Sequence, residues 1–213
     1  ERRARLGEYL QSVGDALDKA RDAMSFEVKE ISRHAVSIGE ILDSQAGMAY
    51  LNKPFSAVSL AEIFTEAAQR VRERFGESAV VVMDPSIGTI PEVLGERIGL
   101  SQVALNLLNN AMEAIAGRAQ GAGRITIRGG VVEVGGSSTV FVQVEDNGVG
   151  IGKDDLTAIF GRGVSSKGTG RGIGLHWCAN TIARMRGQLS ASSAGAEQGA
   201  TFELRLPAAL ETV

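Results

Sequence analysis

The stretch that decides the fold is residues 144–175, VEDNGVGIGKDDLTAIFGRGVSSKGTGRGIGL. It begins at the end of an alternating apolar run over residues 140–144, which predicts a buried strand. One acidic residue, Asp146, follows that strand, and Gly148 and Gly150 come directly after it. Because glycine adopts positive φ at little cost and lets the backbone approach a ligand closely, this loop can wrap a flat ring.

The second half of the stretch places glycine at four alternate positions within residues 168–174, just before an apolar helical pattern that runs to Met185. Such a segment presents backbone N–H groups and a helix N-terminus to phosphates. Lys167 and Arg171 stand among these glycines. Each is by default a solvated loop cation, and we expect a phosphate contact from Lys167 before Arg171. Either loop alone is a weak signal, but together they predict a nucleotide site.

A helical pattern over residues 102–115 carries two amides on an otherwise apolar face. Asn106 and Asn110 stand one turn apart on that face. Asparagine is a mediocre helix former and a costly core residue, so both side chains need partners. One interpretation is a pair of caps or solvent-facing amides. The glycine loops favour the other, in which an amide oxygen meets Mg²⁺ and phosphate oxygens, because Mg²⁺ prefers hard oxygen ligands.

These segments, with two further ones, resemble the N, G1, F, G2 and G3 boxes of a sensor histidine kinase, and they occur in that order. The matching residues are Asn106-x-x-x-Asn110-Ala111, Asp146-Asn147-Gly148-Val149-Gly150-Ile151, Phe160, Gly170-Arg171-Gly172-Ile173-Gly174-Leu175 and Gly199-Ala200-Thr201-Phe202. The resemblance implies an α+β fold, the two-layer α/β sandwich of the gyrase, chaperone, histidine kinase and MutL ATP-binding superfamily, preceded by a long stalk helix.

The resemblance also implies residue roles with ATP and Mg²⁺ as cofactors. Asp146 would accept the adenine amino group, helped by Thr201 through a water molecule, and Asn110 would hold Mg²⁺. Residues 170–175 would cap the phosphates beneath a lid at about 153–174. The expected catalytic residues are Asn106, Asn110 and Lys167. The expected nucleotide-binding residues are Asn106, Asn110, Asp146, Gly148, Gly150, Ile151, Phe160, Lys167, Gly170, Arg171, Gly172, Ile173, Gly174, Leu175 and Thr201.

Three residues of the helix after the last glycine have less specific interpretations. His176 lies where the helix dipole disfavours its charged form. It either contacts a phosphate or packs against neighbouring side chains. Trp177 is expected in the core or as a cover for the helix. Cys178 is expected to be buried filler rather than a reactive thiol.

Composition agrees with a nucleotide-binding domain plus an appendage. The chain has 213 residues, 44% of them hydrophobic, which is enough for a sizeable core. A net charge of −3 argues against a nucleic-acid partner. A single cysteine excludes an internal disulfide and fits a reducing compartment. The sequence contains no membrane span and no signal peptide pattern. It starts without Met, so we expect a cytoplasmic fragment whose membrane anchor, if any, lies outside it.

The first fifty residues predict a long helix. Apolar residues recur every seven positions at Leu10, Leu17, Met24, Ile31 and Ile38, which indicates a stripe packed against partners. The alternative is a helix packed on its own domain, because four glycines weaken a coiled coil. The resemblance assigns residues 1–52 to a dimerisation and phosphotransfer stalk, of which only the second helix is evident, and residues 54–213 to the catalytic domain. It implies a homodimer formed through the stalk.

His34 lies in this segment and is a poor match for the phosphoacceptor. A neutral imidazole is a nucleophile that needs orientation rather than a strong base. Ala35 follows it, where the family's acceptor box has an acidic residue. We therefore expect the phosphoacceptor histidine upstream of the fragment. The alternative is that His34 is the acceptor. The ordinary interpretation is that His34 is a structural histidine at the edge of the apolar stripe of the stalk helix.

Downstream of Pro54, patterns predict the remaining elements. Ser59 to Glu62 resembles a capping box that opens a helix to about Phe75. A brief helix is expected over residues 154–160 and a longer one from Leu175 to Arg186. Strands are expected at residues 79–83, 124–128, 139–145, 188–193 and 201–206.

The residue four before Asn110 bears on the reaction. Gyrase-type ATPases carry there a glutamate that activates water, whereas Asn106 cannot accept a proton at neutral pH. Help from a general base is worth roughly 10²–10⁴ in rate, so we expect ATP hydrolysis to be poor. Glu113 would replace the missing base only if the helix were shifted. A serine kinase of the same fold would lack its base for the same reason.

The resemblance thus implies a protein-histidine kinase that transfers the γ-phosphoryl of Mg-ATP to a stalk histidine and then to a response-regulator receiver aspartate. The alternatives are an ATP-hydrolysing conformational switch of the same superfamily and a catalytically silent dimeric scaffold.

Overall fold

The computed structural model describes Met24 and residues 55–118, 121–156, 158–161 and 173–209. The chain divides into two units, Glu1–Pro54 and Phe55–Val213, and the architecture below is that of the second. The expected stalk, with His34, lies outside the described residues apart from Met24. The boundaries of the two domains remain a prediction.

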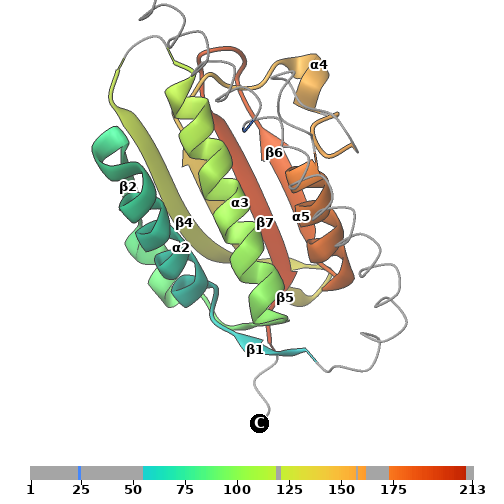
Figure 1. The fold of residues 1–213 in the computed structure, drawn as a ribbon. Helices are drawn as coiled ribbons and strands as arrows, with labels where there is room; N and C mark the ends of the chain where they lie inside the picture. The colour runs from blue at the N-terminus through green and yellow to red at the C-terminus, as the bar shows by residue number, and fades with distance from the viewer. Residues whose placement is uncertain (1–23, 25–54, 119–120, 157, 162–172, 210–213) are drawn as a thin grey trace, which may run out of the picture. The chain divides into compact units, whose positions relative to one another are not determined.

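The second unit is a five-stranded mixed sheet with helices packed on one face (Figure 1). The strand order is β2-β4-β5-β7-β6, in which β2 runs parallel to β4 and every other pair is antiparallel. The strands are β2 (Ala79–Met83), β4 (Gly123–Val134), β5 (Ser137–Asp146), β6 (Gln188–Ser192) and β7 (Ala200–Pro207). The helices are α2 (Leu60–Phe75), α3 (Arg97–Ala116), α4 (Lys153–Leu156) and α5 (Ile173–Arg184). The predicted α+β sandwich is confirmed.

Two short strands flank this sheet. β1 (Ser56–Val58) pairs antiparallel with β3 (Val93–Gly95) just before α3 begins. Between β2 and β3 the chain forms a 3-10 helix, Pro85–Thr89, capped by the Asp84 carboxylate, which accepts from the Ser86 N–H over 2.9 Å. Neither short strand was among those predicted, because three-residue strands carry too little periodicity to be recognised.

The core lies between the sheet and the helices. Alternate residues of β5, namely Val140, Val142 and Val144, are fully buried on the helix-facing side. The central helix α3 buries residues around much of its circumference because α2 and α5 lie on either side of it (Figure 1). Of the described helices, none is long and apolar enough to cross a membrane.

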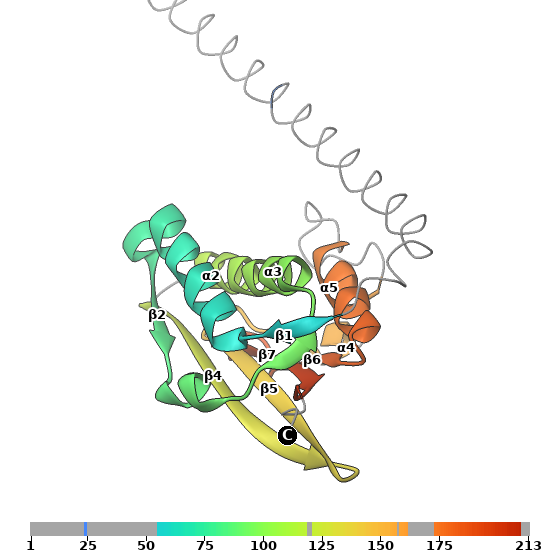
Figure 2. The same ribbon diagram turned by 90° about the horizontal axis from the view of Figure 1, so that it is seen from below.

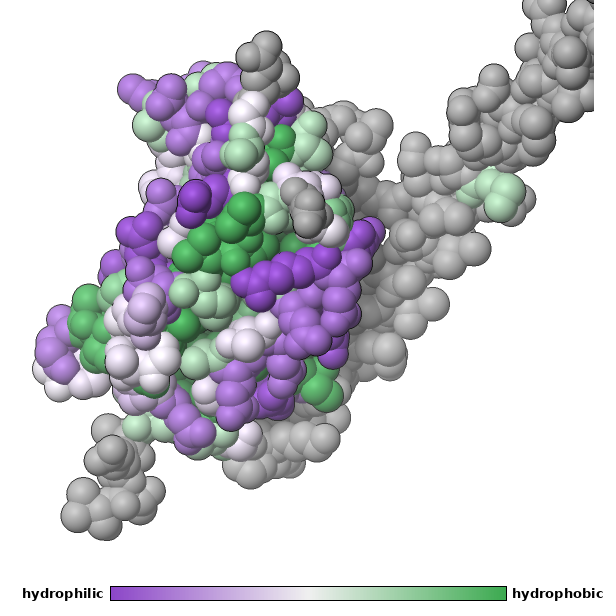
Figure 3. All heavy atoms as spheres, turned by 90° about the vertical axis from the view of Figure 1, so that its left-hand side faces the viewer, coloured by the Kyte–Doolittle hydropathy of each residue, from purple (hydrophilic) through white to green (hydrophobic). Residues whose placement is uncertain are grey.

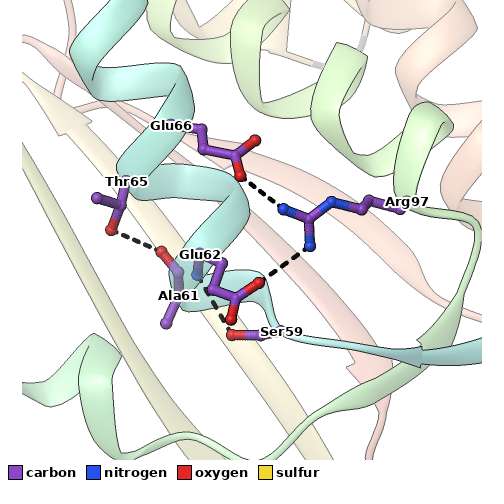
Figure 4. Close-up of polar contacts among 6 residues, drawn as sticks. All are labelled: Ser59, Ala61, Glu62, Thr65, Glu66 and Arg97. Atoms are coloured by element: carbon purple, nitrogen blue, oxygen red, sulfur yellow. Dashed lines mark hydrogen bonds and ion pairs between the residues drawn. The ribbon is translucent and has the colours of Figure 1, made fainter.

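The start of α2 confirms Ser59 as the N-cap of the predicted capping box, whereas the Glu62 side chain pairs with Arg97 instead of returning to the Ser59 N–H. The Ser59 hydroxyl accepts a hydrogen bond from the Glu62 N–H over 3.3 Å. Glu62, in the first turn of α2, and Glu66, one turn later, form ion pairs of 3.0 and 2.6 Å with Arg97, the first residue of α3 (Figure 4). All three side chains are about half-exposed, so the contacts orient the two helices and contribute little to stability.

The β4–β5 hairpin is longer than predicted and extends past the helices (Figure 2). The alternating pattern had predicted a first strand that ends at residue 128. Gly130 nevertheless lies within the strand. The residue is glycine because a side chain there would collide with the Phe141 ring, which lies over it. Gly135 and Gly136 make the turn with φ of 60° and 81°, as a two-residue hairpin of the primed type requires.

β2 is an edge strand on the side of the molecule shown in Figure 3, where apolar side chains form a strip bordered by hydrophilic ones. Val80 on this strand is 56% exposed. Arg72 of α2 donates a hydrogen bond from Nη2 to the Val81 carbonyl over 2.6 Å. This contact occupies a backbone acceptor that an edge strand otherwise offers to another chain.

Candidate nucleotide-binding site

Asp146 ends β5 and forms the buried base of the first glycine loop. Asp146 is only 4% exposed, and the residues opposite it in the sheet are Ile125 on β4 and Ala200 on β7. Oδ1 accepts a hydrogen bond from the Gly148 N–H over 2.8 Å, which fixes the turn after the strand. A carboxylate held rigidly among apolar neighbours is suited to accept a hydrogen bond from a ligand that enters the loop.

The loop packs directly against the C-terminal part of α3. The Val149 N–H donates to the Ala114 carbonyl over 3.1 Å. A Cβ at Gly148 would lie 2.5 Å from the Ala114 Cβ, so only glycine fits there. Close approach of the loop backbone to the helix is therefore the physical reason for this glycine.

Asn147 fastens the loop to the start of β4, a role that sequence analysis did not identify. Its Oδ1 accepts from the Arg124 N–H over 2.8 Å, and its Nδ2 donates to the Ala122 carbonyl over 2.9 Å. The side chain is thus committed to the backbone and positions Asp146 beside it. An Asn after a buried strand is a common turn residue, so the sequence offers no distinct signal for this contact.

The segment between β6 and β7 covers the other side of the loop. The Glu197 N–H donates to the Val149 carbonyl over 2.7 Å, and the Gly199 N–H donates to the Gly148 carbonyl over 3.1 Å. Gly150 has a φ of 72°, and a side chain at that position would run into the Gly195 carbonyl. Tertiary contact as well as backbone conformation therefore requires glycine here.

Thr201 does not lie beside Asp146. In the β5–β7 register, Ala200 stands opposite Asp146, and Thr201 stands opposite Glu145. Directly opposite residues of an antiparallel pair project from the same face of the sheet, and successive residues project from opposite faces. Thr201 therefore shares the outer face with Glu145, and the structure corrects the expectation that its hydroxyl assists Asp146.

Of the three asparagines of α3, Asn106 and Asn110 stand one turn apart and have different environments. Asn106 donates from Nδ2 to the Cys178 Sγ over 3.5 Å and accepts at Oδ1 from the Gln102 Nε2 over 3.1 Å. Asn110 is partly buried, and its side chain forms no hydrogen bond with another described residue. Asn106 therefore links α3 to α5, whereas the Asn110 amide makes no such link among the described residues.

The described residues contain no cluster of three or more His, Cys, Asp or Glu that could hold a metal by itself. A single amide oxygen such as that of Asn110 fits Mg²⁺, which keeps several waters and is bound by one or two protein ligands together with substrate phosphates.

Cys178 is fully buried, as sequence analysis expected. Burial raises the pKa of its thiol to about 11, and the hydrogen bond from Asn106 acts in the opposite direction. The thiol is therefore neutral at physiological pH and serves as a packed hydrogen-bond acceptor rather than a nucleophile.

His176, in the first turns of α5, joins that helix to Phe160. Its Nδ1 lies 2.9 Å from the Phe160 carbonyl, and its Nε2 lies 3.1 Å from the Asn180 Nδ2. A carbonyl only accepts, so Nδ1 carries the proton and Nε2 accepts from the Asn180 amide. Lys167 and residues 170–172 lie outside the described residues, as does the side chain of Ile173. Gly174 is exposed, and Leu175 and Phe160 pack against the core.

Comparison with known families agrees with this geometry. A family profile described as "Histidine kinase-, DNA gyrase B-, and HSP90-like ATPase" matches residues 95–210, more than half of the chain. The chain belongs to this family. The matched region starts two residues before α3 and contains the Asp146 loop and β7.

Relatives include the sensor histidine kinase ZraS of Escherichia coli K12, 28% identical over 209 residues, which cover 95% of this chain and 41% of ZraS. The sensory histidine kinase/phosphatase NtrB of Rhodobacter capsulatus is 34% identical over 164 residues, covering 71% of this chain and 43% of NtrB. The C4-dicarboxylate transport sensor protein DctS of the same species is 30% identical over 152 residues, which cover 71% of this chain and 22% of DctS. The chain thus spans less than half the length of these relatives.

Solved structures of similar fold include the mycobacterial sensor histidine kinase MprB, with a TM-score of 0.58, 23% identity, and coverage of 72% of this chain and 97% of that one. Full-length ShkA in complex with AMPPNP gives a TM-score of 0.57 and 23% identity over 73% of this chain and 31% of that one. Together with the family profile, these likenesses identify the catalytic ATP-binding domain of a histidine kinase.

Proposed function

We propose that this domain binds Mg-ATP and donates its γ-phosphoryl group to a histidine. The observation that carries the proposal is the buried Asp146 carboxylate, held at the base of a glycine loop by the Gly148 N–H. In this arrangement one carboxylate oxygen keeps the loop closed, and the carboxylate accepts a hydrogen bond from the adenine amino group. Family membership and the AMPPNP complex of ShkA support a nucleotide as the ligand.

Asn110 is proposed to hold Mg²⁺ through its amide oxygen, which has no partner among the described residues. When bound, the ion neutralises charge on the phosphates. Lys167 and the glycines of residues 170–174 are proposed to bind the phosphates on the side of α5, where the helix N-terminus favours anions. Thr201, on the opposite face of the sheet from Asp146, is not part of the proposed site.

Asn106 favours transfer over hydrolysis. Its amide cannot accept a proton, and both ends of the side chain are engaged by Cys178 and Gln102. Water at the γ-phosphate therefore lacks a general base at this position. A neutral imidazole needs no such base, because catalysis of phosphoryl transfer depends mainly on positioning and charge neutralisation.

In the proposed reaction, an imidazole nitrogen attacks the γ-phosphorus, the bond between this phosphorus and the β,γ-bridging oxygen breaks, and ADP leaves. The phosphoryl group then passes to an aspartate of a response-regulator receiver domain. The proposed acceptor is a stalk histidine upstream of this chain, with His34 as the alternative, and the stalk is proposed to form a homodimer. Relatives named as sensor histidine kinases support this sequence of steps.

The test is incubation with γ-labelled Mg-ATP of the wild type, His34→Gln and Asn110→Ala, with nucleotide binding measured in parallel. We expect Mg-ATP to bind through Asn110 without labelling of the fragment. An acid-labile label that His34→Gln loses would instead identify His34 as the acceptor. Absence of nucleotide binding would overturn the proposal in favour of a scaffold, and rapid release of inorganic phosphate would favour a hydrolytic switch.

A further inference from the structure

We infer that Ser193 is a positioning residue that holds the Asp146 loop in the shape that binds the nucleotide base. This inference rests on the proposed function. Ser193 follows β6 and belongs to none of the motifs that predicted the site. Its hydroxyl nevertheless contacts both the loop and the segment that covers it.

The Ser193 hydroxyl is the meeting point of several backbone groups. Oγ accepts hydrogen bonds from the Ile151 N–H over 3.0 Å and from the Gly195 N–H over 3.2 Å. It donates to the Gly199 carbonyl over 2.6 Å, and the Gly195 carbonyl is a second, longer contact at 3.3 Å. A hydroxyl has one donor and two acceptor lone pairs, so this arrangement uses its whole hydrogen-bonding capacity.

These bonds connect the two walls of the site. Ile151 lies near the end of the glycine loop, and the Gly199 N–H donates to the Gly148 carbonyl near the start of that loop. Ser193 therefore fixes the loop directly at Ile151 and, through Gly199, at Gly148. The loop itself contains glycine at residues 148, 150 and 152, which gives its unconstrained backbone many conformations.

Ser193 acts through the loop, because its hydroxyl is already satisfied by backbone groups. Removal of the hydroxyl leaves the Ile151 N–H and the Gly199 carbonyl without this partner, and part of the binding energy is then spent on ordering the loop. The loss of affinity should arise where the loop binds the base of the nucleotide, and not at its phosphates. It should therefore be the same with and without Mg²⁺, unlike a loss at Asn110.

The experiment compares ADP affinity of the wild type, Ser193→Ala, Ser193→Thr and Asn110→Ala by calorimetry, each with Mg²⁺ and with EDTA. Ser190→Ala is the matched control, because Ser190 lies on β6 and its hydroxyl makes no hydrogen bond to another described residue. We expect Ser193→Ala to weaken binding about tenfold under both conditions. Ser193→Thr, which keeps the hydroxyl, and Ser190→Ala should stay within about threefold of the wild type.

Amide hydrogen exchange without nucleotide provides the second measurement. The Ile151 amide should exchange faster in Ser193→Ala than in the wild type, while amides of the β5 strand keep their protection. Wild-type affinity in Ser193→Ala, or equal losses in the Ala and Thr variants, would overturn the inference and leave the proposed function intact. If the wild type bound no nucleotide at all, the proposed function itself would fail.

Discussion

The Asn106 side chain on α3 donates a hydrogen bond to the Cys178 Sγ on α5, and this contact joins two residues 72 positions apart in the sequence. It links the helix that carries Asn110 to the helix that follows the second glycine loop. Asn110, one turn further along α3, has no such bond to a described residue. Two asparagines in one motif thus have different physical roles.

Substitution of the two asparagines should separate these roles. Asn110→Ala should weaken Mg-ATP binding more than tenfold and remove the difference between Mg²⁺ and EDTA, because the amide oxygen proposed to hold Mg²⁺ is lost. Asn106→Ala should lower the free energy of unfolding by about 1–2 kcal/mol, since an interhelical hydrogen bond is lost from a partly buried site. Calorimetry and urea denaturation measure the two effects. A purely Mg²⁺-dependent loss in Asn106→Ala would contradict the assignment.

The Cys178 thiol should make stability fall at high pH. Its pKa in the folded state is about 11, above the unperturbed value of 9.0, so the unfolded chain releases its proton first. The contribution is fully present below about pH 9 and is lost as the pH rises toward 11, with a total of about 2–3 kcal/mol. Urea denaturation between pH 8 and 11 tests this in the wild type and in Cys178→Ala, which should lack the component. Rapid alkylation of the native thiol at pH 8 would contradict it.

Gly150 and Gly135 form a matched pair for testing the loop. Both have positive φ, 72° and 60°, but a side chain at Gly135 meets nothing within 4 Å, whereas one at Gly150 meets the Gly195 carbonyl. Gly135→Ala should cost only the backbone penalty of about 1–2 kcal/mol and leave ATP binding unchanged. Gly150→Ala should also abolish ATP binding, because the loop must shift. Equal ATP affinity in the two variants would show that contact with residue 195 does not shape the site.

His176 should be replaceable by a residue that keeps its donor. His176→Ala removes the hydrogen bond to the Phe160 carbonyl and leaves the Asn180 amide without its acceptor, so we expect a loss of about 1–2 kcal/mol in unfolding free energy. His176→Gln supplies an amide N–H and should recover part of that loss. Equal destabilisation by Ala and Gln in urea denaturation would indicate packing of the ring rather than the hydrogen bond.

Arg97 should matter little for stability despite its two short ion pairs. Because Glu62, Glu66 and Arg97 are all about half-exposed, solvent screens their attraction. Arg97→Ala should therefore shift the melting temperature only slightly, and the difference should disappear in 1 M salt, where the Debye length is about 3 Å. A large, salt-independent shift would show that the pair is needed for the packing of α2 on α3.

Several features of the site followed from local sequence. Ser59 and Glu62 predicted the start of α2 because a capping box acts over three residues. Alternating valines predicted β5, and the acid and glycines after it predicted the loop, because strand burial and positive φ each leave a signature in adjacent residues. The family motifs then indicated the fold, which the family profile and the strand order confirm.

Other features were decided only by the tertiary structure. The family resemblance implied that Thr201 assists Asp146. The face on which a strand residue lies depends on its pairing register with a distant strand, however, and that register puts Ala200 opposite Asp146. The hydroxyl of Ser193 meets the Ile151 N–H across 42 positions. The sequence by itself determined the main helices, the strands of the large sheet and the family motifs, because these depend on neighbouring residues. Which of the motif residues face the site, and which others hold it in shape, depended on contacts between segments far apart in the chain.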